Sequence, residues 1–319
     1  MNTIGILTSG GDAPGMNSAI RAIVRTAINN DLRVKGIRNG YDGLMHGDIY
    51  EMNVSSVADI IQKGGTILGT ARSLEFKEPE GQKKGAQILK DYGIDGLIVI
   101  GGDGSFKGAL ALSKLGINTI AIPGTIDNDM GYTDFTIGFF TAVETIIDAI
   151  GKLRDTSSSH GRAAIIEVMG RNCGDLALYA GLAGGAESII VPEHEFSMDD
   201  IVSKVQHGVK RGKLHHLITL AEGVGDPYEV AKEVNLKTGV ETRVTVLGHV
   251  QRGGAPAAPD RLLGATMGAK AVELLLENQS GIAIGFSDGK LKSTPISEAV
   301  KLGRHLNESL YRLANNLSN

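Results

Sequence analysis

Residues 96–105 read GLIVIGGDGS, and residues 118–129 read NTIAIPGTIDND. Each segment begins with a largely apolar run rich in β-branched residues, and each run gives way to glycines and aspartates. A run of this kind is typical of a parallel strand that is buried on both faces. In parallel sheets a ligand binds beyond the carboxyl ends of the strands. The two segments therefore predict an α/β fold in which functional residues directly follow the strands.

The same alternation continues along the chain and changes character near residues 138 and 250. We expect strands at 3–8, 34–38, 96–100, 118–122, 163–169, 188–191, 216–221, 243–247 and 282–286. We expect helices at 16–30, 80–92, 105–115, 139–158, 174–184, 198–211, 228–237 and 258–278. This order predicts two three-layer αβα lobes with mostly parallel sheets. The larger lobe is expected at 1–138 plus 251–301, and the smaller at 139–250 plus 302–319.

Composition narrows the class of protein. Of 319 residues, 42% are hydrophobic and 21% are charged, as in soluble globular proteins. The formal net charge of −4 argues against general binding of nucleic acids or anionic membranes. One cysteine, Cys173, fits a reducing compartment, and we interpret it as a packing residue. We see no secretion signal and no run of about 20 apolar residues, so we expect a cytoplasmic protein.

Glycine-rich turns follow two of the expected strands. They read SGGDAPGMN at 9–17 and GGDGS at 101–105. Glycine lets a backbone approach a phosphate, and the start of a helix presents free N–H groups to it. Asp103 can hold Mg²⁺ directly or through water. An ordinary βα turn explains the first segment as well as a phosphate loop does, and it explains the second less well.

PGTIDND at 123–129 places two acids two residues apart. In an extended segment both would point to one side, and adjacent like charges are unfavourable unless a cation or proton lies between them. One carboxylate can accept a proton from an attacking hydroxyl while the other orients a metal. Thr125 can donate a hydrogen bond to a transferring phosphoryl group. The alternative is a pair of solvated loop acids.

Arginine residues recur in similar places, at the ends or edges of expected strands. They are Arg72, Arg162, Arg171, Arg243 and Arg252, with Glu222 and His249 in comparable positions. A single arginine of this kind is usually a solvated residue, whereas a recurring set suits the binding of several phosphoryl groups. Together with the glycine loops and aspartates, this set predicts phosphoryl transfer by positioning and charge stabilisation.

On these motifs the chain resembles the bacterial ATP-dependent 6-phosphofructokinase family along essentially its whole length. The motifs are ILTSGGDAPGMN, GGDGS, PGTIDND, VMGR, AEG and GHVQRGG. The resemblance implies the phosphofructokinase fold and transfer of a phosphoryl group from ATP to the 1-hydroxyl of D-fructose 6-phosphate. The products are fructose 1,6-bisphosphate and ADP, the reaction is the committed step of glycolysis, and Mg²⁺ assists. The larger lobe would bind ATP and the smaller lobe the sugar phosphate.

The resemblance also assigns roles to individual residues. The catalytic set would be Asp127 as general base with Arg72, Arg171, Thr125 and Asp129. ATP would bind along Gly11, Arg72, Ser73, Gly102, Asp103, Gly104 and Ser105, with Mg²⁺ at Asp103 and Asp129. The sugar phosphate would contact Thr125, Ile126, Asp127, Arg162, Met169, Gly170, Arg171, Glu222, Arg243, His249, Val250, Gln251 and Arg252. Arg162 and Arg243 would come from a neighbouring subunit of a homotetramer.

A second site implied by the resemblance lies between subunits and binds ADP or phosphoenolpyruvate as effectors. Its residues would be Arg21, Arg25, Arg154, Gly185, Glu187, Arg211, Lys213 and His215. Arg21 and Arg25 are one helical turn apart and can face one anion, although a solvated basic edge has the same pattern. Two positions depart from the family: Leu214 replaces the second lysine of the usual GKKH, and Phe140 stands where aspartate is common.

Glycine at 104 and 124 indicates ATP as the donor, because pyrophosphate-using relatives tend to carry aspartate and lysine there. Two other functions are considered. One is a different kinase with a GGDG loop, such as an NAD or lipid kinase, but those lack the sugar site of the GHVQRGG type. The other is a non-catalytic sugar-phosphate sensor, which could have lost Asp127 or Asp103, and this chain retains both.

Overall fold

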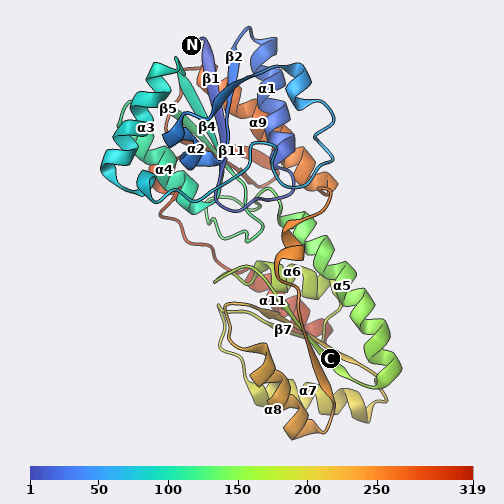
Figure 1. Ribbon diagram of the computed structural model, residues 1–319. Helices are drawn as coiled ribbons and strands as arrows, with labels where there is room; N and C mark the ends of the chain where they lie inside the picture. The colour runs from blue at the N-terminus through green and yellow to red at the C-terminus, as the bar shows by residue number, and fades with distance from the viewer. Residues whose placement is uncertain (319) are drawn as a thin grey trace. The chain divides into compact units, whose positions relative to one another are not determined.

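The computed structural model describes residues 1–318, which form two compact units (Figure 1). Unit 1 contains Met1–Ile126, Met130–Thr141 and Arg252–Gly303. Unit 2 contains Asp127–Asp129, Ala142–Gln251 and the chain from Arg304 onward. These boundaries lie close to the expected ones, except that the short segment Asp127–Asp129 belongs to unit 2. The assignment of ATP to one unit and sugar phosphate to the other stays a prediction.

Unit 1 is built on a seven-stranded sheet with the order β11-β10-β5-β4-β1-β2-β3. Its strands are β1 (Thr3–Ser9), β2 (Arg33–Ile37), β3 (Ile49–Met52), β4 (Gly96–Gly101), β5 (Asn118–Pro123), β10 (Ile282–Ser287) and β11 (Lys290–Pro295). The two edge strands, β3 and β11, are antiparallel to their neighbours, and the other pairings are parallel. Every residue of β1 and β4 is buried, as expected for central parallel strands.

Helices cover both faces of this sheet. They are α1 (Met16–Asn29), α2 (Gly40–His46), α3 (Pro79–Asp91), α4 (Asp103–Lys114), α9 (Ala258–Leu276) and α10 (Ile296–Ala299), with 3₁₀ turns η1 (Val54–Val57) and η2 (Glu75–Lys77). Helix α1 packs along α9 on one face, and α3 packs beside α4 on the other (Figure 1). Side chains alternate along the strands, so Leu97 and Val99 join the core under α3 and α4.

Unit 2 has a four-stranded, all-parallel sheet with the order β7-β8-β6-β9. Its strands are β6 (Ala163–Val168), β7 (Ser188–Ile190), β8 (His216–Ala221) and β9 (Thr242–Val246). Its helical segments are most of α5 (Phe139–His160), α6 (Asp175–Gly184), α7 (Met198–Lys210), α8 (Pro227–Thr238), α11 (Glu308–Leu317) and the 3₁₀ turn η3 (Gly248–Arg252). Ile218 and Leu220 face the core under α7 and α8, whereas Thr219 bonds to α6. The α/β fold with two layered units is therefore confirmed.

Among residues 1–318, five α-helices and strands were not predicted from the sequence: α2, β3, β11, α10 and α11. Strands β3 and β11 are edge strands whose side chains are mostly half-buried or exposed, so they lack an apolar run. Helix α2 has seven residues, of which two are glycine, and α11 buries only Ala314. No helix among residues 1–318 is long and apolar enough to span a bilayer.

A buried aspartate on α9 fixes the start of helix α5. Asp260 Oδ1 accepts a hydrogen bond from the Gly138 N–H at 2.8 Å, and Oδ2 accepts one from the Thr141 N–H at 2.7 Å. The Thr141 hydroxyl also donates to Oδ2 and accepts from the Ala257 N–H at 2.9 Å. Burial raises the pKa of Asp260, and these hydrogen bonds partly offset the rise.

Phe140, where the resemblance implies aspartate, lies in the same first turn of α5. Asp260 already supplies a carboxylate to the first turn of α5. Phe140 instead packs against Phe135, with ring centroids 4.7 Å apart, and against Phe139, at 5.5 Å. An apolar residue is therefore compatible with this helix start.

We expect Asp260→Ala to lower the free energy of unfolding by about 3 kcal/mol, because buried donors at the start of α5 lose their acceptor. Asp226→Ala is the matched control, since Asp226 caps α8 through the Tyr228 N–H but is exposed. That variant should lose about 1 kcal/mol. Urea unfolding followed by circular dichroism measures both, and equal losses would contradict the special role of Asp260.

Candidate functional site

In unit 1 the predicted nucleotide residues gather where β1 and β4 end. The Ser105 hydroxyl donates to the Ser9 carbonyl at 2.9 Å and ties the first turn of α4 to the end of β1. A Cβ atom on Gly101 would lie 2.4 Å from both Ser9 O and Ser105 Oγ, so only glycine fits there. Gly102 then caps α4 in an extended conformation. The two glycines thus let the chain turn tightly from the strand into the helix.

The surface at the start of α4 is open. A Cβ atom on Gly104 would meet no atom within 4 Å, and the backbone there is not left-handed. Asp103 is half-buried, and its Oδ2 lies 2.6 Å from Lys107 Nζ. Helix N-termini with free N–H groups and no covering side chain are suited to phosphate binding.

Other predicted nucleotide residues lie in neighbouring loops of unit 1. A Cβ atom on Gly11 would lie 2.0 Å from Arg252 Nη1, so the guanidinium of Arg252 lies directly against this glycine. Arg72 is exposed and Ser73 is half-buried in the loop before η2. Gly124 is more restricted than Gly104, because a Cβ atom there would lie 2.9 Å from Met16 Cε.

Two predicted sugar-site residues also belong to unit 1. Thr125 is half-buried, and its carbonyl accepts a hydrogen bond from the Thr136 hydroxyl at 2.6 Å. Ile126 is buried, with 1% of its surface exposed. These contacts fix the chain immediately before it enters the acidic segment of unit 2.

In unit 2 the acidic pair lies against a predicted arginine. Asp127 is 1% exposed, and its Oδ2 is 3.2 Å from Arg171 Nε. Arg171 Nη1 is 4.0 Å from Asp129 Oδ2. A cation therefore does lie beside both acids, as their spacing predicted. The segment that carries the two acids is not extended as expected, because Asn128 between them has a left-handed backbone with φ +53°.

The backbone around Arg171 is unusual for the same reason. Arg171 has φ +55°, and its N–H donates to Glu222 Oε1 at 2.8 Å. A Cβ atom on Gly223 would lie 2.1 Å from the Arg171 carbonyl oxygen. Gly170 has φ +127°, and a Cβ atom there would lie 2.4 Å from the Cys173 carbonyl oxygen. Strained backbone of this kind is concentrated at functional sites.

Two further parts of the predicted sugar site are found on unit 2. Arg162 Nε is 2.7 Å from Glu241 Oε2, and Arg243 pairs with the other oxygen of the same carboxylate. The hydrogen bond from Arg162 is the largest of the effects that lower the pKa of Glu241, and Arg243 lowers it further. The structure thus brings the two predicted arginines together through an acid that the sequence analysis missed. Its only signal is its position two residues before Arg243.

Segment η3 divides its predicted residues between surface and interior. His249 and Val250 are exposed. Gln251 is fully buried: its Oε1 accepts from the Met169 N–H at 3.1 Å, and its Nε2 donates to the Gly248 carbonyl at 2.9 Å. The side chain of Gln251 therefore supports the loop around Met169, and its predicted contact with sugar phosphate stays a prediction.

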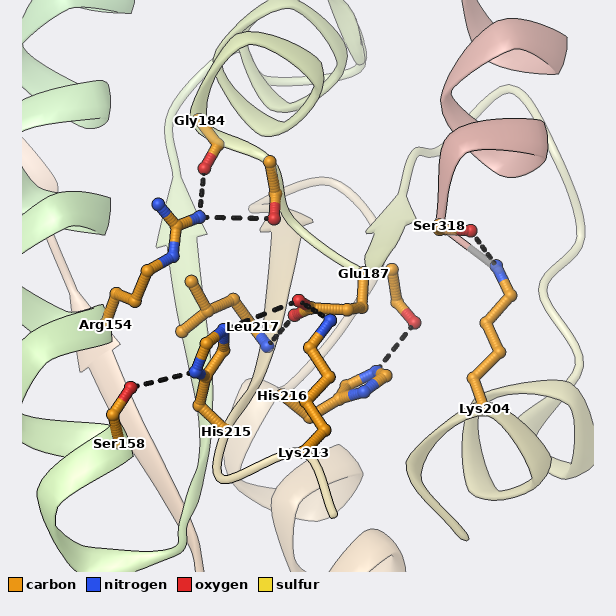
Figure 2. A network of polar contacts seen from close by, with 12 residues as sticks. Arg154, Ser158, Gly184, Glu187, Lys204, Lys213, His215, His216, Leu217 and Ser318 are labelled. Atoms are coloured by element: carbon orange, nitrogen blue, oxygen red, sulfur yellow. Dashed lines mark hydrogen bonds and ion pairs between the residues drawn. The ribbon is translucent and has the colours of Figure 1, made fainter. Parts of the chain in front are cut away.

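A separate basic cluster in unit 2 contains most of the predicted effector residues (Figure 2). Lys213 pairs with Glu187 Oε1, and His215 Nε2 lies 3.7 Å from the same oxygen. Glu187 is buried, and its Oε2 accepts from the Leu217 N–H at 2.5 Å. Arg154 donates to the Gly184 and Gly185 carbonyls from α5. Arg21 and Arg25 lie on α1 of unit 1.

A cavity of about 660 Å³ opens beside this cluster. Predicted residues Gly185, Glu187, Arg211 and Lys213 line it, together with five polar residues that were not predicted: Ser203, Lys204, His207, His216 and Ser318. Burial lowers the pKa of His216 to about 4, so this histidine is neutral at pH 7. The cationic groups that remain on its wall favour an anionic ligand.

The single cysteine of the chain is buried. Burial raises the pKa of the Cys173 thiol to about 12, which agrees with its interpretation as a packing residue. Among residues 1–318, no three His, Cys, Asp or Glu side chains group as metal ligands. Mg²⁺ usually binds to one or two carboxylates plus substrate phosphates, so single carboxylates such as Asp103 and Asp129 fit it.

The chain was compared with known proteins. The family model described as Phosphofructokinase matches residues 3–275. The protein named ATP-dependent 6-phosphofructokinase from Finegoldia magna is 67% identical over 318 residues, and the one from Clostridium tetani is 60% identical. Both alignments cover 100% of this chain and 100% of the relative.

Solved structures agree. Phosphofructokinase from Saccharomyces cerevisiae has a TM-score of 0.88 at 36% identity, and the match covers 100% of this chain and 47% of that one. A pyrophosphate-dependent phosphofructokinase from Marinobacter aquaeolei has a TM-score of 0.87 at 20% identity, covering 97% of this chain and 86% of that one, and supports the fold alone. The matches in sequence and in structure extend over both units, and the chain belongs to the phosphofructokinase family.

Proposed function

We propose that this protein is an ATP-dependent 6-phosphofructokinase, which transfers a phosphoryl group from ATP to the 1-hydroxyl of D-fructose 6-phosphate. The observation that carries the proposal is the buried carboxylate of Asp127 held against Arg171 directly after β5. The names of relatives 67% and 60% identical over their whole length support the donor and the acceptor. A role in glycolysis and a cytoplasmic location go with this reaction.

In the proposed mechanism Asp127 accepts the proton of the sugar 1-hydroxyl as its oxygen attacks the phosphoryl group. Arg171 and Arg72 balance the negative charge that spreads over the phosphoryl oxygens, and Thr125 donates a hydrogen bond to them. Arg171 is 60% exposed although it pairs with a buried acid, so part of its guanidinium remains accessible to an anionic ligand. Glu222, Met169 and the residues of η3 would hold the sugar.

Asp103 and Asp129 are the carboxylates that would hold Mg²⁺. Bound there, the ion would neutralise charge on the phosphates and orient them. This chain's own contribution is the pair of carboxylates and the open glycine surface at the start of α4. Asp129 is partly exposed, and its Oδ2 lies 4.0 Å from Arg171 Nη1, at the limit of an ion pair.

The sugar 6-phosphate would be bound by Arg162 and Arg243 of a neighbouring subunit in a homotetramer. Both side chains converge on Glu241 and remain partly exposed; Arg162 directly precedes β6, and Arg243 lies on β9, an edge strand. An arriving phosphate would compete with Glu241 for the two guanidinium groups. The basic cavity beside Glu187 would take ADP or phosphoenolpyruvate as regulatory ligands.

A non-catalytic sugar-phosphate sensor is the second candidate. It would need the sugar-binding residues but not a buried acid next to an arginine. Burying a carboxylate is unfavourable, and its retention is more easily explained by a reaction that uses it.

Asp127→Ser should lower kcat by roughly 10²–10⁴-fold or more, because the hydroxyl cannot accept the proton, while fructose 6-phosphate still binds. A coupled assay for fructose 1,6-bisphosphate gives kcat, and calorimetry gives sugar binding. Asp199→Ser, at an exposed aspartate on α7, is the control and should keep wild-type turnover. Unchanged turnover in Asp127→Ser would remove this residue from the mechanism and favour the sensor.

Gly104→Asp should raise the KM for ATP at least about tenfold, because a carboxylate enters the open surface where phosphates are proposed to bind. The melting temperature should change little, since a Cβ atom meets nothing there. Gly104→Ala adds only a methyl group and should change KM less than about threefold. If the aspartate variant kept the wild-type KM for ATP, the nucleotide would bind elsewhere.

Leu214→Lys should lower the concentration of phosphoenolpyruvate that gives half its effect, because it adds an amine beside Lys213. Leu214 is 62% exposed, so the change needs no repacking. Lys213→Ala should raise the same concentration at least about tenfold by removing a cation from the cavity. Measuring turnover at increasing phosphoenolpyruvate concentrations gives this value for each variant. Curves identical to that of the wild-type protein for both variants would exclude this cavity as the effector site.

A further inference from the structure

The segment Asp127–Asp129 is attached to unit 2 through the residue between its two acids. Asn128 is fully buried, and its Nδ2 donates to Asp175 Oδ2 at 2.8 Å. Its φ of +53° is a conformation that asparagine tolerates better than most residues. Asp175 is the first residue of α6 and is also fully buried. The turn between the catalytic acids is therefore anchored to a helix.

Asp175 is in turn held by an arginine from the C-terminal part of the chain. Arg304 Nε and Nη2 lie 2.9 Å and 2.7 Å from Asp175 Oδ2, the oxygen that also accepts from Asn128. The Arg304 side chain is 16% exposed, so this ion pair is largely removed from water. Charge-assisted hydrogen bonds in such surroundings are short and strong, and they fix geometry as well as charge.

The three residues come from distant parts of the chain. Asn128 and Asp175 are 47 residues apart, and Asp175 and Arg304 are 129 apart. Because Asn128 separates Asp127 from Asp129, the conformation of its backbone sets the direction in which both carboxylates leave the chain. A change of that φ would rotate Asp127 away from Arg171.

We propose that Asn128, Asp175 and Arg304 form a buried clamp that positions Asp127 and Asp129 for proton transfer. They are positioning residues, because none of them is placed on substrate or on the reacting atoms. The inference rests on the proposed function, in which Asp127 is the general base. It predicts that breaking the clamp reduces the rate of chemistry more than the affinity for substrates.

A purely structural role is the alternative. Buried ion pairs often add little net stability, and a clamp of this kind could serve only the packing of α6. The two roles differ in what they change. A structural role changes the melting temperature, whereas a positioning role lowers kcat in a variant that remains folded.

Asn128→Gly separates the two roles. Glycine adopts the left-handed backbone freely, so the turn can still form, but the side-chain bond to Asp175 is lost. We expect kcat to fall roughly 10- to 100-fold, because small displacements of catalytic groups have effects of this size. The KM values for ATP and fructose 6-phosphate should change less than about threefold. Wild-type kcat in this variant would overturn the proposal.

Val234→Ala is the matched control for stability. Val234 lies on α8 in the core of unit 2, and the change should lower the melting temperature without changing kcat. If it reduced kcat as much as Asn128→Gly does, general loosening of unit 2 would explain the effect and the clamp would be rejected.

A second series keeps the test decisive if a single variant folds poorly. Arg304→Met leaves the Asp175 carboxylate buried without its cation and should lower the melting temperature strongly. Adding Asp175→Leu removes that charge and should recover much of the melting temperature, while kcat stays low because Asn128 has lost its carboxylate partner. Recovery of both quantities in the double variant would show a structural role only.

Asp127→Ser distinguishes failure of this inference from failure of the proposed function. If Asp127→Ser loses turnover while Asn128→Gly retains it, the general base stands and the clamp fails. If Asp127→Ser retains turnover, the proposed function itself fails, and the clamp has no base to position.

Discussion

The ion pair between Asp127 and Arg171 is the interaction on which the site depends. A carboxylate that is 1% exposed has lost most of its hydration, and a nearby cation offsets part of that cost. Arg171 supplies the cation while 60% of its side chain stays accessible. The pair is therefore asymmetric, because the carboxylate is buried and the guanidinium side chain is largely exposed to solvent. Such a pair holds the acid in place and still leaves positive charge for a phosphoryl group.

Both units place their functional residues by the same rule. In unit 1 the carboxyl ends of β1 and β4 lead into glycine turns and the start of α4, which offer N–H groups. In unit 2 the ends of β6 and β8 lead to Arg171 and Glu222, which are joined by a hydrogen bond. Parallel strands end at one edge, so residues far apart in sequence meet there.

The parts of this protein that could be predicted from sequence are those with a local signal. Strands β1, β4, β5, β6 and β8 are buried apolar runs, and Asp127 and Arg171 follow two of them. Edge strands β3 and β11 and helix α11 bury too few residues to show a pattern, and α2 is short and contains two glycines.

Residues whose role depends on distant contacts could not be recognised in this way. Asn128 reads as part of a loop motif, and Asp175 reads as an ordinary first residue of a helix. Only the fold shows that they share an oxygen with Arg304. Gln251 shows the opposite case, because the motif placed it on substrate and the structure buries its side chain between Met169 and Gly248.

Two residues at this ion pair have a left-handed backbone: Arg171, which is a member of the pair, and Asn128, which follows Asp127. Such a backbone costs about 1–3 kcal/mol for a residue other than glycine. Such strain persists only where the surroundings determine it. For Arg171 they are the bond to Glu222 and the space left by Gly223. For Asn128 they are Asp175 and, through it, Arg304. In the proposed mechanism the C-terminal segment therefore contributes to the catalytic geometry, because Arg304 holds the carboxylate that accepts the Asn128 hydrogen bond between the two acids.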